Sequence, residues 1–189
     1  MGEVNILVGL SGVGKGTVLE EAMLLADQDY EVINYGDRML ELAKDEGLVE
    51  NRDELKELDS ETNRRIQEEA AESIQQDAEE DDVLVETHAA IKTPSGYLPG
   101  LPEWTVKNLE PSKIIMLRAD PESLWERVKE DDSREREHES PAGIEEYQEV
   151  AREMASTCAV ISGAFLRVIE NEDGKAEKAA EELVDTLKS

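Results

Sequence analysis

The sequence predicts an α/β fold in three layers, in which helices cover a five-stranded parallel sheet. Five β-type runs alternate with stretches of helical pattern, as in parallel sheets. The fourth run contains Ile114-Ile115-Met116-Leu117, and such a continuous apolar stretch is typical of a strand buried on both faces. No repeat or linker divides the 189 residues, so we expect one domain over 1–189. The five runs are Val4–Gly9, Tyr30–Asn34, Val83–Thr87, Lys113–Leu117 and Phe165–Glu170.

Three amphipathic helices are expected between and after these runs, at Ser60–Glu80, Pro141–Ser162 and Lys175–Leu187. Cys158 lies on the apolar face of the second of these, so we interpret it as part of the core. A single cysteine permits no internal disulfide and fits a reducing cytoplasm.

A glycine-rich loop follows the first run and opens a helical stretch. It reads Gly9-Leu10-Ser11-Gly12-Val13-Gly14-Lys15-Gly16-Thr17. Its glycines let backbone N–H groups turn inward around phosphates, and the N-terminus of the following helix adds partial positive charge. Lys15 is predicted to reach the β- and γ-phosphates of a nucleoside triphosphate. Because Gly16 stands where the pattern has Ser or Thr, the hydroxyl on the Mg²⁺ side is assigned to Thr17.

Polar residues follow the second and third runs, at the edge of the sheet where parallel strands present ligand sites. Asp37 either points into the cleft or caps a helix over Arg38–Lys44, and both roles can hold together. Glu86 ends an apolar strand and is predicted to hold Mg²⁺ through its water shell. His88 is interpreted as a polar loop residue or a hydrogen-bond donor to substrate, in preference to a metal pair with His138.

The segment 88–104 is the least acidic stretch of the chain. Its three prolines and two glycines predict a stiff loop that cannot be strand. Lys92, beside the hydroxyls of Thr93 and Tyr97, is placed to meet an anionic substrate. The alternative is a rigid connection into a helix that starts near Pro102.

A polar segment over 131–140 lacks apolar anchors, so we expect it to be mobile. Arg134 and Arg136 could fold over bound phosphates and stabilise charge on the transferring group. The alternative is a solvated charge run in which the arginines pair with neighbouring acids.

The charge balance is strongly acidic. The chain has 20 Lys and Arg against 47 Asp and Glu, a net charge of −27. Such a surface repels nucleic acid and anionic membranes. Similar acidity is typical of proteins from salt-loving microorganisms, where concentrated cations screen the repulsion. With no signal peptide and no apolar run of membrane-spanning length, we expect a cytoplasmic protein.

Five motifs together resemble the archaeal-type adenylate kinases over nearly the whole chain. The resemblance implies a P-loop kinase fold, a helical AMP-binding segment at about 36–59, a short lid at about 129–141 and a homotrimer. It also implies the reaction ATP + AMP ⇌ 2 ADP with Mg²⁺. The chain departs from the family's usual residues at Gly16 and Glu86, where Thr and Asp are more common. The motifs are Gly9–Thr17, Asn34-Tyr35-Gly36-Asp37, Val85-Glu86-Thr87-His88, Ile91–Pro102 and Ala119-Asp120-Pro121-Glu122.

The site expected on this basis transfers a phosphoryl group in line, without a covalent intermediate or a general base. Two alternatives remain, a P-loop kinase acting on another small substrate or monophosphate, and a nucleotide-dependent ATPase switch. The expected catalytic residues are Lys15, Arg134 and Arg136, the expected Mg²⁺ ligands are Thr17 and Glu86, and the expected substrate-binding residues are Asp37, Arg38, Arg52, Thr87, His88, Lys92 and Tyr97.

Overall fold

A computed structural model describes residues 2–130 and 140–189 of the chain. Its central sheet has five parallel strands in the order β2-β3-β1-β6-β7. All five runs expected from the sequence form these strands, which confirms the predicted α/β class. The strands are β1 (Val4–Val8), β2 (Glu31–Asn34), β3 (Val83–Thr87), β6 (Lys113–Arg118) and β7 (Phe165–Glu170).

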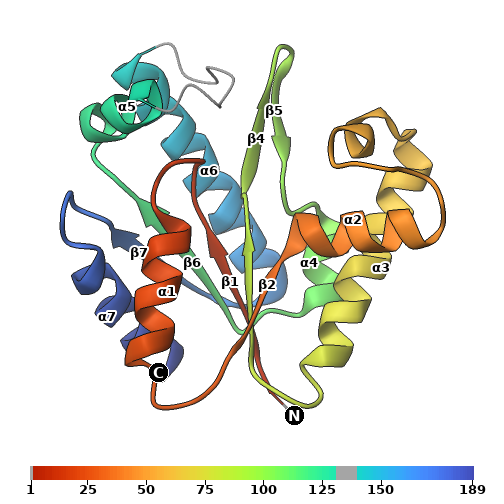
Figure 1. Ribbon diagram of the computed structural model, residues 1–189, viewed down its shortest axis with the longest axis horizontal. Coiled ribbons are helices and arrows are strands. Elements are labelled where there is room, and N and C mark those ends of the chain that lie inside the picture. The colour runs from red at the N-terminus through yellow and green to blue at the C-terminus, as the bar shows by residue number, and fades with distance from the viewer. Residues whose placement is uncertain (1, 131–139) are drawn as a thin grey trace.

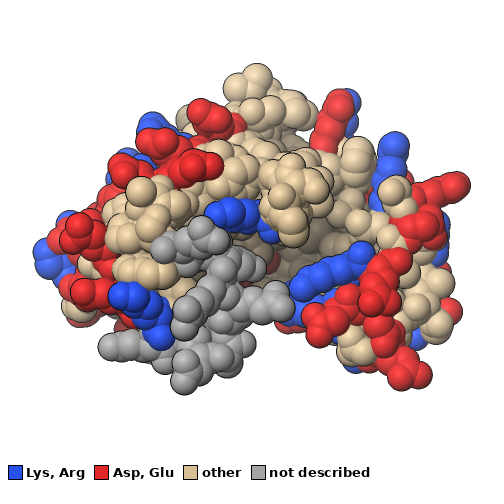
Figure 2. Space-filling view, turned by 90° about the horizontal axis from the view of Figure 1, so that it is seen from above, with Lys and Arg blue, Asp and Glu red and all other residues tan. Residues whose placement is uncertain are grey.

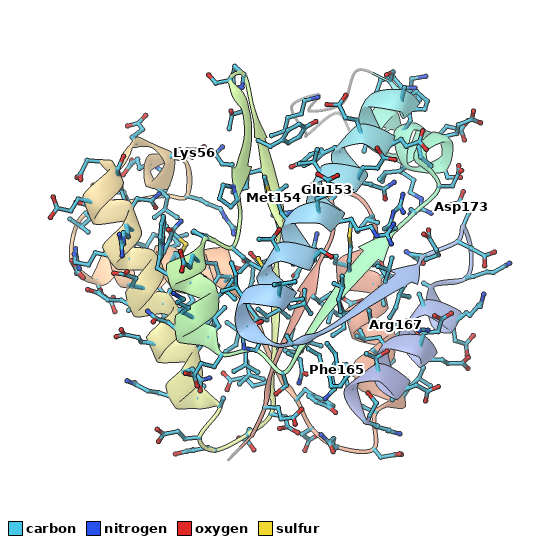
Figure 3. All side chains as sticks on the ribbon, turned by 180° about the vertical axis from the view of Figure 1, so that it is seen from behind. Lys56, Glu153, Met154, Phe165, Arg167 and Asp173 are labelled. Atoms are coloured by element: carbon cyan, nitrogen blue, oxygen red, sulfur yellow. The ribbon has the colours of Figure 1, made fainter. Side chains whose placement is uncertain are left out.

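Helices cover both faces of this sheet. Helices α1 and α7 pack against each other on one face, and α6 crosses the other face beside α4 and α3 (Figures 1 and 3). The helices are α1 (Lys15–Leu25), α2 (Tyr35–Asp45), α3 (Ser60–Asp77), α4 (Glu103–Leu109), α5 (Pro121–Glu130), α6 (Pro141–Ser162) and α7 (Ala176–Leu187), with a short 3₁₀ helix at Asp53–Glu57.

The core lies on both sides of the central strand β1 and its neighbour β6. All five residues of β1 are buried, and so are the first five of β6. Cys158 of α6 is also buried, and its thiol donates to the carbonyl of Leu101 at 3.4 Å. Burial raises the pKa of this thiol to about 11, so it packs as a small apolar side chain.

The prediction of a strandless loop after β3 was wrong. Strands β4 (Ala90–Thr93) and β5 (Gly96–Pro99) form an antiparallel hairpin that stands above the edge of the sheet (Figure 1). The prolines do not interrupt it, because Pro94 lies in the turn and Pro99 at the end of β5. Tyr147 of α6 anchors β4, since its hydroxyl accepts from the Lys92 amide at 3.1 Å and donates to the Ala90 carbonyl at 3.0 Å.

Other boundaries differ by a few residues. Helix α3 ends at Asp77 and not at Glu80, because 78–80 form a turn. Helix α6 spans the residues predicted for it. Within the described residues, no helix is long and apolar enough to cross a membrane.

Candidate active site

The phosphate-binding loop lies between β1 and α1, at the carboxyl end of the sheet. Several of its glycines are required by its shape, and Gly14 and Gly9 show the two reasons. Gly14 precedes α1 with φ of 96°, a left-handed conformation that side chains disfavour. A Cβ on Gly9 would lie 2.8 Å from the carbonyl oxygen of Leu117. Gly16, by contrast, faces open space, so the departure from the family at this position has no steric cause.

Lys15, the first residue of α1, folds its side chain back into the loop. Its ammonium donates to the carbonyls of Gly9 at 2.9 Å and Leu10 at 3.3 Å, and its side chain is only 7% exposed. Glu86 Oε1 lies 3.9 Å from the same nitrogen. A buried ammonium held by the loop's own carbonyls is positioned to contact a phosphate that enters the loop.

Thr17 and Glu86 provide the oxygen atoms expected for Mg²⁺. Thr17 is exposed on the first turn of α1, and Glu86, at the end of β3, is partly exposed and accepts weakly from Asn34 Nδ2 at 3.4 Å. The described residues contain no cluster of three or more His, Cys, Asp or Glu that could hold a metal. One hydroxyl and one carboxylate fit Mg²⁺, which keeps most of its ligands as water and substrate phosphate oxygens.

His88 lies directly against the loop and holds a proton on Nδ1. This nitrogen is 2.9 Å from the carbonyl oxygen of Gly9, and a carbonyl can only accept. Burial, together with the positive charges of Lys15 and Arg52, lowers the pKa of His88 to about 4, although the hydrogen bond to Gly9 acts in the opposite direction. The imidazole is therefore neutral at neutral pH, and its Nδ1 proton is engaged by the loop.

Arg52 lies across the start of α2. Its guanidinium donates to Asp37 Oδ1 at 3.0 Å and to Asn34 Oδ1 at 3.1 Å. Gly36 permits this approach, because a Cβ there would collide with the guanidinium. The cap of α2 is Asn34, whose side chain accepts from the amide of Asp37. The alternative that Asp37 caps this helix was therefore wrong.

Arg38 points elsewhere. Its guanidinium donates to Ser73 Oγ at 2.6 Å and to Asp77 Oδ2 at 2.7 Å, both on α3, and its side chain is 17% exposed. Arg38 thus ties α2 to α3, whereas the more exposed Arg52 contacts Asn34 and Asp37 at the start of α2.

Two further residues expected to bind substrate lie on one face of the β4–β5 hairpin. Lys92 and Tyr97 are directly opposed across β4 and β5, so their side chains share a face. The Tyr97 ring contacts that of Tyr147 with centroids 5.3 Å apart, and its hydroxyl donates to Glu146 on α6. The shared face is thus turned toward α6. Thr87 ends β3 and is partly buried beneath the hairpin's start.

Charge is distributed unevenly over the face that carries the loop. Viewed from above, this face is hollowed near its centre, blue basic side chains border the hollow, and most red acidic ones lie toward the rim (Figure 2). The positive groups near the loop are therefore concentrated where a nucleotide phosphate would sit. Arg134, Arg136 and His138 lie outside the described residues.

Sequence reasoning missed three residues that organise the site. Asn34 caps α2 and holds Arg52, Tyr147 anchors the hairpin, and Asn171 contacts the loop from the end of β7. Asn34 belonged to a recognised motif, and Asn171 began a predicted turn. The sequence position of these two asparagines did not indicate which groups they contact.

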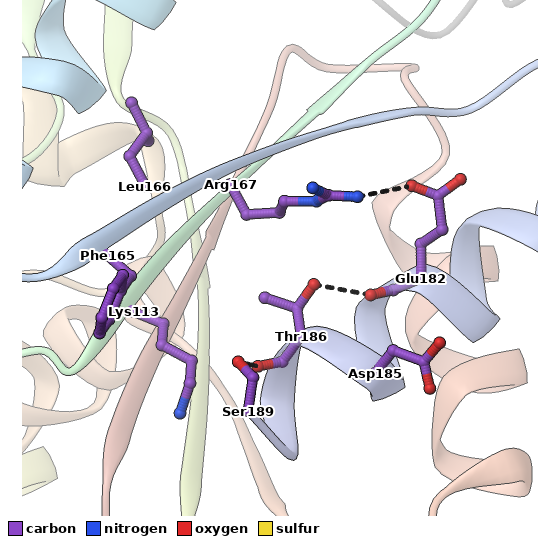
Figure 4. A pocket seen from close by; sticks show the side chains of 8 residues that line it. All are labelled: Lys113, Phe165, Leu166, Arg167, Glu182, Asp185, Thr186 and Ser189. Atoms are coloured by element: carbon purple, nitrogen blue, oxygen red, sulfur yellow. Dashed lines mark hydrogen bonds and ion pairs between the residues drawn. The ribbon is translucent and has the colours of Figure 1, made fainter.

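A second cavity, of about 350 Å³, lies between β7 and α7 (Figure 4). Several of its polar groups are paired with one another: Arg167 with Glu182 at 3.4 Å, and the Thr186 hydroxyl with the Glu182 carbonyl at 2.7 Å. Lys113 pairs with Glu3 at 2.8 Å. We therefore place the functional site at the loop and not in this cavity.

The parallel sheet, the glycine loop and the buried lysine define a P-loop nucleotide-binding protein. The chain matches the family model described as an AAA domain over residues 8–145. It has the fold of a shikimate kinase from Acinetobacter baumannii, with a TM-score of 0.56 at 14% identity over 100% of this chain and 94% of the other.

Two curated relatives indicate which kind of P-loop protein this chain is. An adenylate kinase of Methanopyrus kandleri is 46% identical over 100% of both chains, and one of Thermoplasma acidophilum is 40% identical over 97% of both. The chain therefore belongs to the AAA-domain P-loop family and, within it, to the adenylate kinases.

Proposed function

We propose that this enzyme catalyses ATP + AMP ⇌ 2 ADP, with ATP in the glycine loop and AMP between the loop and Arg52. The observation that carries the proposal is the position of His88. Lys15 and Arg52 come from different elements, yet the charges of both act on this one imidazole. Lys15 and His88 also contact the same carbonyl, that of Gly9. Two cations near one neutral side chain suit a reaction that brings two phosphate groups together.

On the donor side, the loop amides and Lys15 bind the phosphate chain of ATP. Lys15 exchanges the carbonyls of Gly9 and Leu10 for phosphate oxygens, so the ammonium keeps hydrogen-bond partners throughout. Thr17 and Glu86 would hold Mg²⁺, which would neutralise charge on the phosphate oxygens.

On the acceptor side, Arg52 binds the phosphate of AMP, with Asp37 holding the guanidinium in place. Thr87, at the end of β3, and Lys92, on the hairpin, complete the acceptor pocket. Tyr97, whose hydroxyl is paired with Glu146, positions the hairpin. Arg134 and Arg136, in a lid at about 129–141, would close over the transferring group, and closure would exclude water.

The assignment of Arg52 to the phosphate of AMP can be tested by substituting Arg52 and Arg38 separately. Arg52→Ala should raise KM for AMP about 10- to 100-fold, the loss expected for a charge-assisted hydrogen bond, and leave KM for ATP unchanged. Arg38→Ala is the matched control, since it removes an arginine that binds α3 and should leave KM for AMP unchanged. A rise in KM for AMP with Arg38→Ala alone would reverse the assignment.

The identity of the acceptor can be tested with a panel of monophosphates. AMP, CMP, UMP and GMP are assayed with ATP at high KCl, and we expect AMP to have the highest kcat/KM. A preference for another monophosphate would support the alternative of a different P-loop kinase.

We also propose that the chain is a cytoplasmic homotrimer adapted to high salt. The net charge of −27 supports the salt adaptation. Apolar side chains exposed near the end of α6 and the start of β7 support self-association: Val160 is 83% exposed, Ile161 41% and Phe165 80%. Phe165 is labelled in Figure 3. Light scattering at molar KCl measures the mass directly, and a monomer would refute the trimer.

A further inference from the structure

Asn171 reaches the phosphate-binding loop from the opposite end of the chain. It follows β7, and its backbone N–H donates to the carbonyl of Arg118 at 2.7 Å. Its side chain is buried, and Nδ2 donates to the carbonyl of Val13 at 2.9 Å. The orientation of the side-chain amide is determined by this contact, because the amide oxygen cannot donate to a carbonyl.

This hydrogen bond fixes the peptide plane between Val13 and Gly14. In a trans peptide the C=O and the following N–H point in opposite directions, and the described residues contain no cis bond. Holding the Val13 carbonyl outward therefore turns the Gly14 N–H inward, toward the phosphates. Gly14 is the residue at which this plane can most easily rotate, because it has no side chain and φ of 96°.

We infer that Asn171 is a positioning residue for ATP, which holds the Val13–Gly14 peptide in its phosphate-binding orientation. The contact is close enough to exclude any side chain at Gly14, since a Cβ there would lie 2.6 Å from Asn171 Nδ2. The inference rests on the proposed binding of ATP in this loop.

The side-chain oxygen of Asn171 argues against a purely structural role for this residue. Asn171 Oδ1 is buried and has no hydrogen-bond partner among the described residues. A buried unpaired acceptor lowers stability, and an apolar side chain of the same shape would avoid that loss. Asparagine at this position is therefore explained by the N–H that it gives to the loop.

Asn171→Leu tests the role, because leucine keeps the branched shape and removes the donor. Calorimetric titration with ATP and with AMP should show that Kd for ATP rises about 10-fold, the loss expected for one buried hydrogen bond, with Kd for AMP unchanged. The melting temperature should change little, because removal of the unpaired Oδ1 offsets the loss of the donor to the Val13 carbonyl. Asn5→Leu is the matched control: Asn5 is a second buried asparagine with an unpaired Oδ1, on β1, and its substitution should leave both Kd values unchanged.

An unchanged Kd for ATP in Asn171→Leu would overturn the inference, and so would an equal loss of ATP and AMP binding with a lower melting temperature. If leucine prevents folding, Asn171→Ala repeats the test without added volume, with the same two outcomes. Failure of the unsubstituted protein to bind ATP would instead refute the proposed function and this inference with it.

Discussion

Acidification should destabilise the protein through His88. The imidazole has a pKa of about 4 in the folded chain, against its usual 6.5, chiefly because it is buried and then because Lys15 and Arg52 repel its charged form. The unfolded chain therefore takes up this proton at a higher pH than the folded chain does. The free energy contributed by neutral His88 is fully present above pH 6.5 and is lost as the pH falls toward 4.

The size of the effect follows from the two pKa values. Each tenfold difference in proton affinity corresponds to about 1.4 kcal/mol, so the loss through this window is about 3 kcal/mol. That is a substantial part of the ~5–15 kcal/mol that stabilises a typical domain.

Urea unfolding of the natural chain and of His88→Asn, followed at several pH values in high KCl, measures this contribution. Asparagine can donate to the Gly9 carbonyl from nearly the same position and does not titrate. The free energy of unfolding of the natural chain should fall by about 3 kcal/mol relative to the variant between neutral pH and pH 4. Subtracting the profile of the variant from that of the natural chain removes the effect of carboxylate protonation, because both proteins contain the same carboxylates. Parallel pH profiles would refute the argument.

Three further predictions follow from the loop, the lid and the charge. Lys15→Ala should lower kcat by at least about 10³-fold without loss of the fold, and steady-state rates within about tenfold of the parent would remove Lys15 from catalysis. Substituting Arg134 and Arg136 together by Ala should lower kcat more than it weakens ATP binding, because their contacts form on closure; no effect on either would indicate a solvated charge run. Raising KCl shortens the screening length from about 30 Å at 0.01 M to about 3 Å at 1 M, so the melting temperature should rise steeply with salt, and a flat midpoint would contradict salt adaptation.

The sequence predicted well those features that depend on neighbouring residues. The glycine loop is defined by spacing alone, because a tight turn around phosphate needs glycine and lysine at set positions. The five strands could be recognised because each is a short apolar run, and α6 because its apolar face repeats at helical spacing over Pro141–Ser162.

The hairpin shows where local reasoning failed. Proline and glycine between 88 and 104 indicated a loop, but β4 pairs with β5 and is held by Tyr147, which contacts Ala90 from 57 positions away. The stabilising partner lies on another helix, so the segment's own composition could not reveal it.

Only the tertiary structure decided which polar side chains face the site. Arg38 and Arg52 were equivalent candidates in the sequence, but packing of α2 against α3 brings Arg38 to Asp77 and leaves Arg52 beside Asn34 and Asp37, at the end of β2 and the start of α2. Asn171 meets Val13 across 158 positions. A hydrogen bond between such distant residues leaves no periodic pattern in the chain, because its geometry is set by how the strands and helices pack and not by the residues on either side.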